Sequence, residues 1–175
     1  MDDILKTVLE NFCKLIDHVT LTIASIIKWA TLAMVIITVV VVILRYLFST
    51  GAIVLQESIM YLHGILFLLA IPYGILKNTH VRVDLIYGPL SQERKDLIDT
   101  LGDCIFLVPV GIFIFATSLP YAEASWLIKE RSPEVGGLPA VFILKICVPL
   151  AGALMTLQGL SQLARRATKK VTGKA

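Results

Sequence analysis

Residues 29–44 have the sequence WATLAMVIITVVVVIL, sixteen consecutive positions without a charged side chain. Three further uncharged runs of nineteen residues each follow at 58–76, 104–122 and 146–164. A helix needs about 20 mainly apolar residues to cross the roughly 30 Å hydrocarbon core of a bilayer. Because backbone groups cannot remain unpaired in lipid, runs of this length indicate helices. The sequence therefore predicts an all-α integral membrane protein with four transmembrane helices.

The overall composition agrees with this fold class. Of the 175 residues, 57% are hydrophobic and 17% are charged, whereas soluble domains have about 45–50% apolar and about 25% charged residues. The formal net charge of +3 is too small to indicate a nucleic-acid-binding surface. Cys13, Cys104 and Cys147 are odd in number and widely spaced, so they predict neither a disulfide framework nor a zinc site.

The uncharged runs and their flanks predict a transmembrane domain at 21–166, with spans at about 26–47, 58–77, 100–122 and 138–164. Lys28 can lie near the end of the first span if its stem stays in the apolar layer while its ammonium group reaches the headgroups. Ser91 is expected to cap the helix that leads into the third span. Pro139 is expected in the first turn of the fourth.

Residues 1–20 have apolar side chains at helical spacing and charged residues on the other face. This pattern predicts an amphipathic helix, which we expect to lie along the headgroups, to pack against a partner helix, or to do both. Residues 167–175 are expected to form a basic tail on the same side of the membrane.

The lysines and arginines predict the orientation. Four of the 16 such residues lie on one side of the predicted membrane. They are Arg45 at the end of the first span, Lys129 and Arg131 after the third span, and Lys145 near the start of the fourth. The other twelve lie in the N-terminal segment, in the connection between the second and third spans, and after the fourth span. Because positive residues remain cytoplasmic, both termini are predicted to face the cytosol.

Few residues are placed to perform chemistry. None of the 13 acidic residues lies in the middle of a span, where a proton-coupled carrier would need a carboxylate. His63 is the one histidine within a span and suggests a packing residue, because a membrane haem commonly needs a pair of histidines. We therefore predict no enzymatic activity and no cofactor. An autonomous small carrier or channel and the membrane anchor of a redox complex remain as alternative functions.

Lys145 is unusual because it lies about two turns inside the fourth span. Its ammonium group can extend outward to the headgroups while its stem stays buried. Alternatively, Lys145 pairs with Glu57 or Glu123, within this chain or at a partner interface.

Several short strings resemble the small membrane subunit, the DctQ family, of tripartite ATP-independent periplasmic (TRAP) transporters. The first group is Arg45-Tyr46, Leu55-Gln56-Glu57, His80-Val81-Arg82-Val83-Asp84 and Leu90-Ser91. The second group is similar to the mannitol/chloroaromatic-type branch and comprises Ser125-Trp126, Glu130, Ser132-Pro133, Gly136-Gly137-Leu138-Pro139, Lys145, Pro149 and Leu157-Gln158-Gly159-Leu160. The similarity extends from about residue 29 to residue 166.

The resemblance implies a bacterial inner-membrane protein with two partners. These are a large, DctM-like membrane subunit that carries sodium and substrate by an elevator-type motion, and a DctP-like periplasmic substrate-binding protein. The cargo of such systems is typically an organic acid. The small subunit is expected to be a separate polypeptide that braces the large one and possesses no catalytic, metal or cofactor site. Structural or partner-contact roles are expected for Arg45, Gln56, Glu57, His80, Arg82, Asp84, Trp126, Glu130 and Lys145. The connection at 123–137 is expected either to help dock the binding protein or to be a structural loop.

Overall fold

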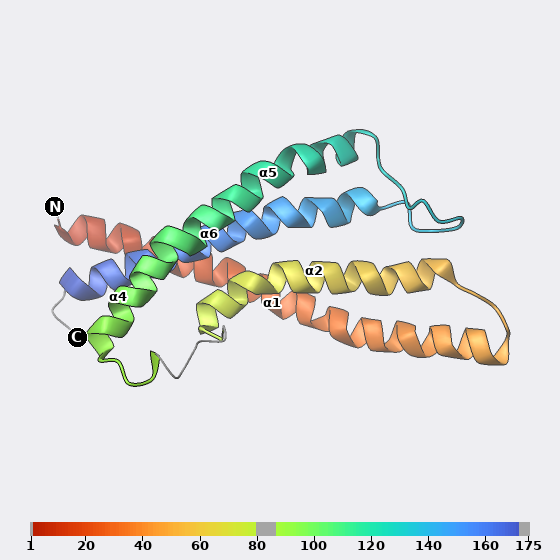
Figure 1. Cartoon of the computed structure of the whole chain (residues 1–175), viewed down its shortest axis with the longest axis horizontal. Coiled ribbons are helices and arrows are strands. Elements are labelled where there is room, and N and C mark those ends of the chain that lie inside the picture. Colours follow the sequence, from red (N-terminus) through yellow and green to blue (C-terminus); the bar gives the residue numbers. More distant parts are fainter. Residues whose placement is uncertain (1, 80–86, 172–175) are drawn as a thin grey trace.

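The computed structural model describes residues 2–79 and 87–171, and all regular secondary structure in these residues is helical. The elements are α1 (Asp2–Leu47), α2 (Ile53–Lys77), α4 (Gln92–Gly102), the π-helix η1 (Asp103–Leu107), α5 (Val108–Leu127) and α6 (Val141–Val171). Four segments are long and apolar enough to cross a membrane, and they are Lys6–Leu47, Ile53–Lys77, Gln92–Leu127 and Val141–Thr168. The predicted fold class is confirmed (Figure 1).

The N-terminal amphipathic segment and the first span form one continuous helix, α1, of 46 residues. No glycine or proline interrupts this stretch, so nothing in the sequence breaks the helical hydrogen bonding. At 1.5 Å per residue α1 is about 69 Å long, more than twice the thickness of a hydrocarbon core. The helix ends before Ser49, which has a φ of 51°.

The third span is a single rod composed of α4, η1 and α5. Ser91 is the N-cap residue of α4, as predicted, but its side chain makes no capping hydrogen bond, and its carbonyl accepts one from the Lys95 N–H. The π-helical turn immediately precedes Pro109. Proline has no N–H to offer the carbonyl four residues earlier, and a local π turn is one way in which a helix accommodates this defect.

The fourth span begins later than predicted. α6 starts at Val141, so Pro139 lies before the helix and not in its first turn. The physical reason is that both backbone groups of Leu138 are used by other elements. Its N–H donates to a carboxylate oxygen of Glu57, and its carbonyl accepts a hydrogen bond from the Ser132 N–H. These contacts hold residue 138 in the preceding connection.

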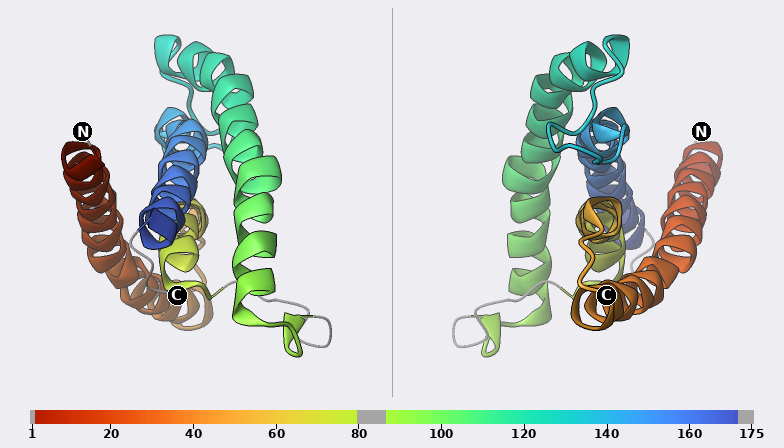
Figure 2. Two further views of the ribbon diagram at one scale, coloured as in Figure 1. Left: turned by 90° about the vertical axis from the view of Figure 1, so that its left-hand side faces the viewer. Right: turned by 90° about the vertical axis from the view of Figure 1, so that its right-hand side faces the viewer.

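The helices form an open arrangement in which α6 occupies a central position. Figure 2 shows α1 and α5 on opposite sides, with α6 and α2 between them. Helices α5 and α6 approach closely at two glycines. A Cβ on Gly111 would lie 2.4 Å from the Thr156 hydroxyl, and a Cβ on Gly152 would lie 2.7 Å from the Phe115 nitrogen. Small residues of this kind allow membrane helices to pack backbone against backbone.

Few side chains are buried in this arrangement. The most buried polar residues, Gln158 and Ser161, lie on α6. By contrast, α1 and α5 expose many large apolar side chains along their length, including Val35, Ile36 and Phe113. Among the described residues, the buried contacts therefore lie between neighbouring helices, while wide apolar faces of α1 and α5 remain exposed.

Candidate functional site

Two groups of polar side chains connect the helices. The first, which we call the loop cluster, consists of Glu57, Glu130, Ser132 and Lys145 and lies where the connections 48–52 and 128–140 are found. Glu57, in the second turn of α2, accepts hydrogen bonds from the Ser132 hydroxyl and, at 2.5 Å, from the Leu138 N–H. Because both donors belong to the connection between α5 and α6, this one carboxylate fixes that connection to α2.

Lys145 completes the loop cluster from α6. Its Nζ lies 2.5 Å from a carboxylate oxygen of Glu130 and 4.1 Å from the centre of the Tyr121 ring. The hydrogen bond from Lys145 lowers the pKa of Glu130 below its ordinary value. The predicted pairing of Lys145 with Glu57 or Glu123 within this chain is wrong, because Glu57 is already bound by the connection and Glu123 lies exposed on α5.

Trp126 lies beside this cluster and is 46% exposed. Its ring meets Phe142 edge to face with the ring centres 5.2 Å apart, and Lys129 Nζ lies 3.3 Å from the centre of a Trp126 ring. Trp126 therefore packs the end of α5 against the start of α6 while keeping one side exposed.

The structure does not bring the other predicted contact residues into this cluster. Arg45 and Gln56 are exposed near the connection between α1 and α2, and neither side chain makes a hydrogen bond or ion pair to the described part of the chain. His80, Arg82 and Asp84 lie outside the described residues. The roles expected for these five residues therefore stay predictions.

The second group, which we call the terminal cluster, lies at the opposite end of the fold, where α1 meets α6. Its members are Asp17, Thr20, Asp99, Asp103, Gln158, Gln162, Arg165 and Arg166. The Thr20 hydroxyl donates to Gln158 Oε1 at 2.9 Å, and Gln158 has no exposed surface. Gln158 Nε2 contacts Asp17 at 3.4 Å, and Asp17 also forms an ion pair with Arg165. These contacts hold the N-terminal part of α1 against α6.

The terminal cluster extends to the other helices. Arg166 lies 2.5 Å from Asp103 of η1 and 3.8 Å from Asp99 of α4. Gln162 Nε2 donates to the carbonyl of Ile75 in α2 at 3.2 Å. One end of α6 therefore contacts every other rod through polar groups. The sequence analysis did not assign these roles, although the three-to-four-residue spacing of polar side chains from Gln158 to Arg166 would have indicated one polar face of a helix.

His63 is positioned differently from the expectation of a packing residue. It is exposed on α2 and stacks on Phe67 with ring centres 6.3 Å apart. The buried side of α2 is marked by Tyr61, and a residue two positions further along a helix points to nearly the opposite side. His63 consequently faces away from the buried side of α2 that Tyr61 marks.

Both clusters consist of hydrogen bonds and ion pairs that join one element to another. No group of three His, Cys, Asp or Glu side chains that could hold a metal ion exists among residues 2–79 and 87–171. The charged groups of both clusters pair with each other across helix boundaries. Their arrangement fixes the relative positions of the rods.

Comparison with known proteins places the chain in a family. No curated protein and no solved structure matches the chain. Residues 34–169, however, match the family described as "Tripartite ATP-independent periplasmic transporters, DctQ component", and this range includes both clusters apart from the α1 residues Asp17 and Thr20. With its four apolar helices, the chain belongs to the DctQ family and is a multi-pass membrane component of a TRAP transporter.

Proposed function

We propose that this chain is the small permease subunit of a sodium-driven TRAP transporter for organic acid uptake. In this proposal it braces the large, elevator-type DctM-like subunit and binds neither substrate nor sodium itself. The observation that carries the proposal is the open arrangement of the four rods. Polar contacts hold the rods together at both ends, whereas long apolar faces of α1 and α5 remain uncovered.

Such an arrangement suits a scaffold better than a carrier. A carrier needs a polar path or a titratable group within the membrane, whereas the charged groups here are concentrated toward the ends of the rods. DctQ components work in TRAP transporters with DctM- and DctP-type partners in general. The uncovered apolar faces provide surface on which a large membrane partner can pack, with lipid covering the remainder.

His63 and Gln56 support a partner on α2. Both side chains are exposed. His63 lies inside the uncharged run of α2, where a polar group that faces only hydrocarbon is costly unless it is paired, and Gln56 lies on the same face of the helix at its outer end. We infer that this face of α2 contacts the large subunit, which supplies hydrogen-bond partners to His63. Arg45, at the neighbouring end of α1, is assigned to the same contact region.

The proposed location is the bacterial inner membrane with both termini in the cytoplasm. The excess of lysine and arginine on the side of the termini supports this orientation. The loop cluster then lies toward the periplasm. The connection 128–140 exposes Val135, whose side chain is 91% accessible, and we assign this connection to docking of the DctP-like binding protein. The strings between Ser125 and Leu160 support placement in the mannitol/chloroaromatic-type branch.

Co-purification in mild detergent tests the proposal. We expect the tagged full-length chain to retain a large protein with many membrane spans. Replacement of the exposed histidine, His63→Ala, is expected to lower the yield of that partner. Val135→Ala, in the connection 128–140, serves as the control and is expected to leave the yield unchanged. Isolation of the chain without any such partner from cells that express the whole transporter would contradict the proposal.

A further inference from the structure

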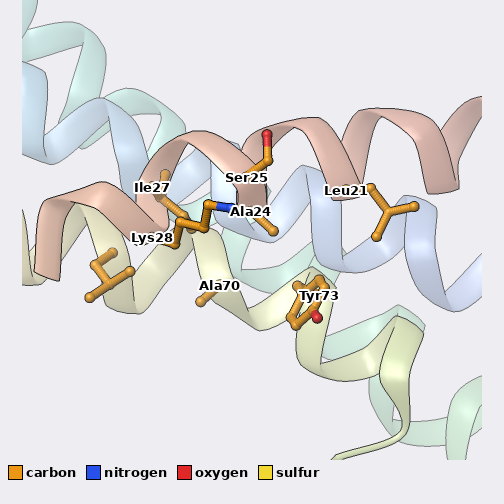
Figure 3. Close-up of a pocket in the computed structure, with 8 residues that line it drawn as sticks. Leu21, Ala24, Ser25, Ile27, Lys28, Ala70 and Tyr73 are labelled. Atoms are coloured by element: carbon orange, nitrogen blue, oxygen red, sulfur yellow. The ribbon is translucent and has the colours of Figure 1, made fainter.

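A groove lies between α1 and α2, on the side of the two termini (Figure 3). Its apolar walls include Leu21, Ala24 and Ile27 of α1, which face Leu66 and Ala70 of α2. The cavity volume is about 380 Å³, and small-molecule sites in proteins have volumes of about 300–1,000 Å³. The groove is thus large enough to hold part of a ligand.

The groove also contains a lysine for which the described residues provide no anion. Lys28 makes no hydrogen bond or ion pair to residues 2–79 or 87–171, and its Nζ lies 5.8 Å from the centre of the Trp29 ring. Figure 3 shows Lys28 extending along the groove with its nitrogen beside Ala24. An ammonium group at an apolar surface is stabilised by an anionic partner.

Tyr73 lines the same groove from the facing helix. It is 37% exposed, and Lys77 Nζ lies 6.0 Å from the centre of its ring. Aromatic side chains with a polar tip and basic side chains are both enriched at the headgroup level of membranes. The end of the groove nearer the termini therefore combines the Tyr73 phenol with the neighbouring Lys77 ammonium group, beside an apolar wall.

The spacing of charges along the helices indicates how deep these groups lie in the membrane. Lys28 and Arg45 bracket the uncharged run of α1 and are about 26 Å apart along the helix axis. Glu57 and Lys77 bracket the uncharged part of α2 and are about 30 Å apart. Since the hydrocarbon core is about 30 Å thick, Lys77 lies at the depth of the phosphate groups on the side of the termini. Ala70, which lines the groove together with Lys28, is about 10 Å further into the membrane along α2. Lys28 must therefore extend outward to reach a phosphate, and Figure 3 shows its nitrogen directed toward Ala24.

We propose that this groove binds an anionic phospholipid from the leaflet on the side of the termini. Lys28 Nζ, which reaches outward to Ala24, binds the headgroup phosphate near Tyr73, and an acyl chain extends from there past Ala70 and Leu66 toward the middle of the membrane. A partner helix is about 10 Å wide and brings no phosphate to Lys28. A flexible acyl chain occupies a smaller cross-section. This inference does not depend on the proposed transport function.

Native mass spectrometry of the purified full-length chain, together with any partner that it retains, tests the headgroup part of the proposal. The probes are phosphatidylglycerol and phosphatidylethanolamine with identical acyl chains. We expect about a fivefold preference for phosphatidylglycerol, the effect of one basic residue near a membrane surface. Lys28→Gln is expected to abolish this preference. Lys14→Gln, which removes another exposed lysine from α1, is expected to preserve it. Absence of the preference in the parent chain, or equal losses in the two variants, would overturn the proposal.

Photo-crosslinking in intact membranes tests which molecule occupies the groove. A benzophenone amino acid at position 70 is expected to form an adduct with phospholipid, detected by the mass of the labelled peptide. The same amino acid at Phe113, exposed on α5, measures the background of crosslinking to bulk lipid, and we expect anionic lipid to be enriched at position 70 relative to that background. Crosslinking of position 70 to a protein partner, or equal lipid composition at the two positions, would contradict the proposal.

Discussion

Glu57 illustrates how one side chain organises a connection in this protein. Its two carboxylate oxygens accept hydrogen bonds from the Ser132 hydroxyl and the Leu138 N–H. A Cβ on Gly137 would lie 2.8 Å from the same carboxylate, so the glycine allows the chain to pass close to it. The connection therefore takes its shape from contacts with α2 as well as from its own turns.

The ion pair between Lys145 and Glu130 predicts a pH-dependent stability. Lys145 lowers the pKa of Glu130 in the folded protein. As the pH falls toward the ordinary pKa of a glutamate, Glu130 is therefore protonated in the unfolded chain before it is protonated in the folded protein. The stabilisation is consequently present at neutral pH and is lost as the pH falls through the lowered pKa. We expect Glu130→Gln to lower the melting temperature in detergent at pH 7 and to have little effect at pH 3.

The matched control for this measurement is Arg131→Gln, at an exposed neighbouring position with no ion pair to the described residues. It is expected to have little effect at either pH. Equal destabilisation by Glu130→Gln at both pH values would show that the pair does not contribute through its charge.

The hydrogen bond between Thr20 and Gln158 predicts an energetic coupling between α1 and α6. Gln158 is fully buried, so its Oε1 relies on the Thr20 hydroxyl as a hydrogen-bond donor. A double-mutant cycle with Thr20→Val and Gln158→Leu, measured by thermal or denaturant unfolding, is expected to give a coupling energy between about 0.6 and about 1.7 kcal/mol, the average and the maximum for hydrogen bonds between membrane helices. Strictly additive effects would contradict a direct interaction.

At the scale of the elements, the contact between α5 and α6 depends on two glycines. Gly152→Ala would place a Cβ 2.7 Å from the backbone nitrogen of Phe115, and backbone cannot move aside as a flexible side chain can. We expect a loss of about 1–3 kcal/mol, as for other overpacked cores. For a protein of this size, each kcal/mol corresponds to a fall of about 2–4 °C in Tm.

Gly102→Ala is the control for this substitution. Gly102 is also helical, with a φ of −59°, and a Cβ there would meet nothing within 4 Å. The alanine is expected to be neutral or stabilising because it reduces the backbone freedom of the unfolded chain. A Gly152→Ala variant as stable as the Gly102→Ala variant would contradict the close approach of α5 to α6.

The number and type of the long helices could be predicted because lipid imposes a length and a composition on each span. The ends of the helices were less predictable. Residue 138 is held outside α6 by hydrogen bonds to Ser132 and Glu57, contacts that join distant parts of the chain. The π turn before Pro109 is one of several ways in which a helix can accommodate a proline, which lacks an N–H donor. The presence of the proline in the sequence does not decide between a π turn and a simple kink.

The partners of charged residues were the least predictable feature. Lys145 was expected to pair with Glu57 or Glu123, but Glu130 is its partner. The path of the connection decides this choice, because the connection both brings Glu130 to Lys145 and occupies Glu57. For Gln158, the amide within an apolar run was visible in the sequence, whereas its partner Thr20 lies 138 residues away along the chain.

At the scale of the whole molecule, the two flanking helices give the protein its open shape. Figure 2 shows α1 and α5 separated by α6 and α2, and the exposed side chains of α1 and α5 are largely apolar. This shape agrees with a subunit that lies beside a larger membrane protein.

The proposed orientation predicts a labelling pattern with a membrane-impermeant maleimide. The experiment uses a Cys104→Ser background, since Cys104 is exposed. Val135→Cys, in the connection 128–140, is expected to react in cells with a permeabilised outer membrane. Glu93→Cys, exposed near the start of α4, is expected to react only after the inner membrane is also opened. The reverse pattern would contradict the orientation.

Uptake by reconstituted vesicles tests the central claim most directly. Vesicles that contain this chain alone, under a sodium gradient, are expected to take up no more of the transporter's organic acid than protein-free vesicles. Vesicles that contain this chain with the large subunit, supplied with the loaded periplasmic binding protein, are expected to accumulate it. Sodium- or proton-driven uptake by this chain alone would contradict the account.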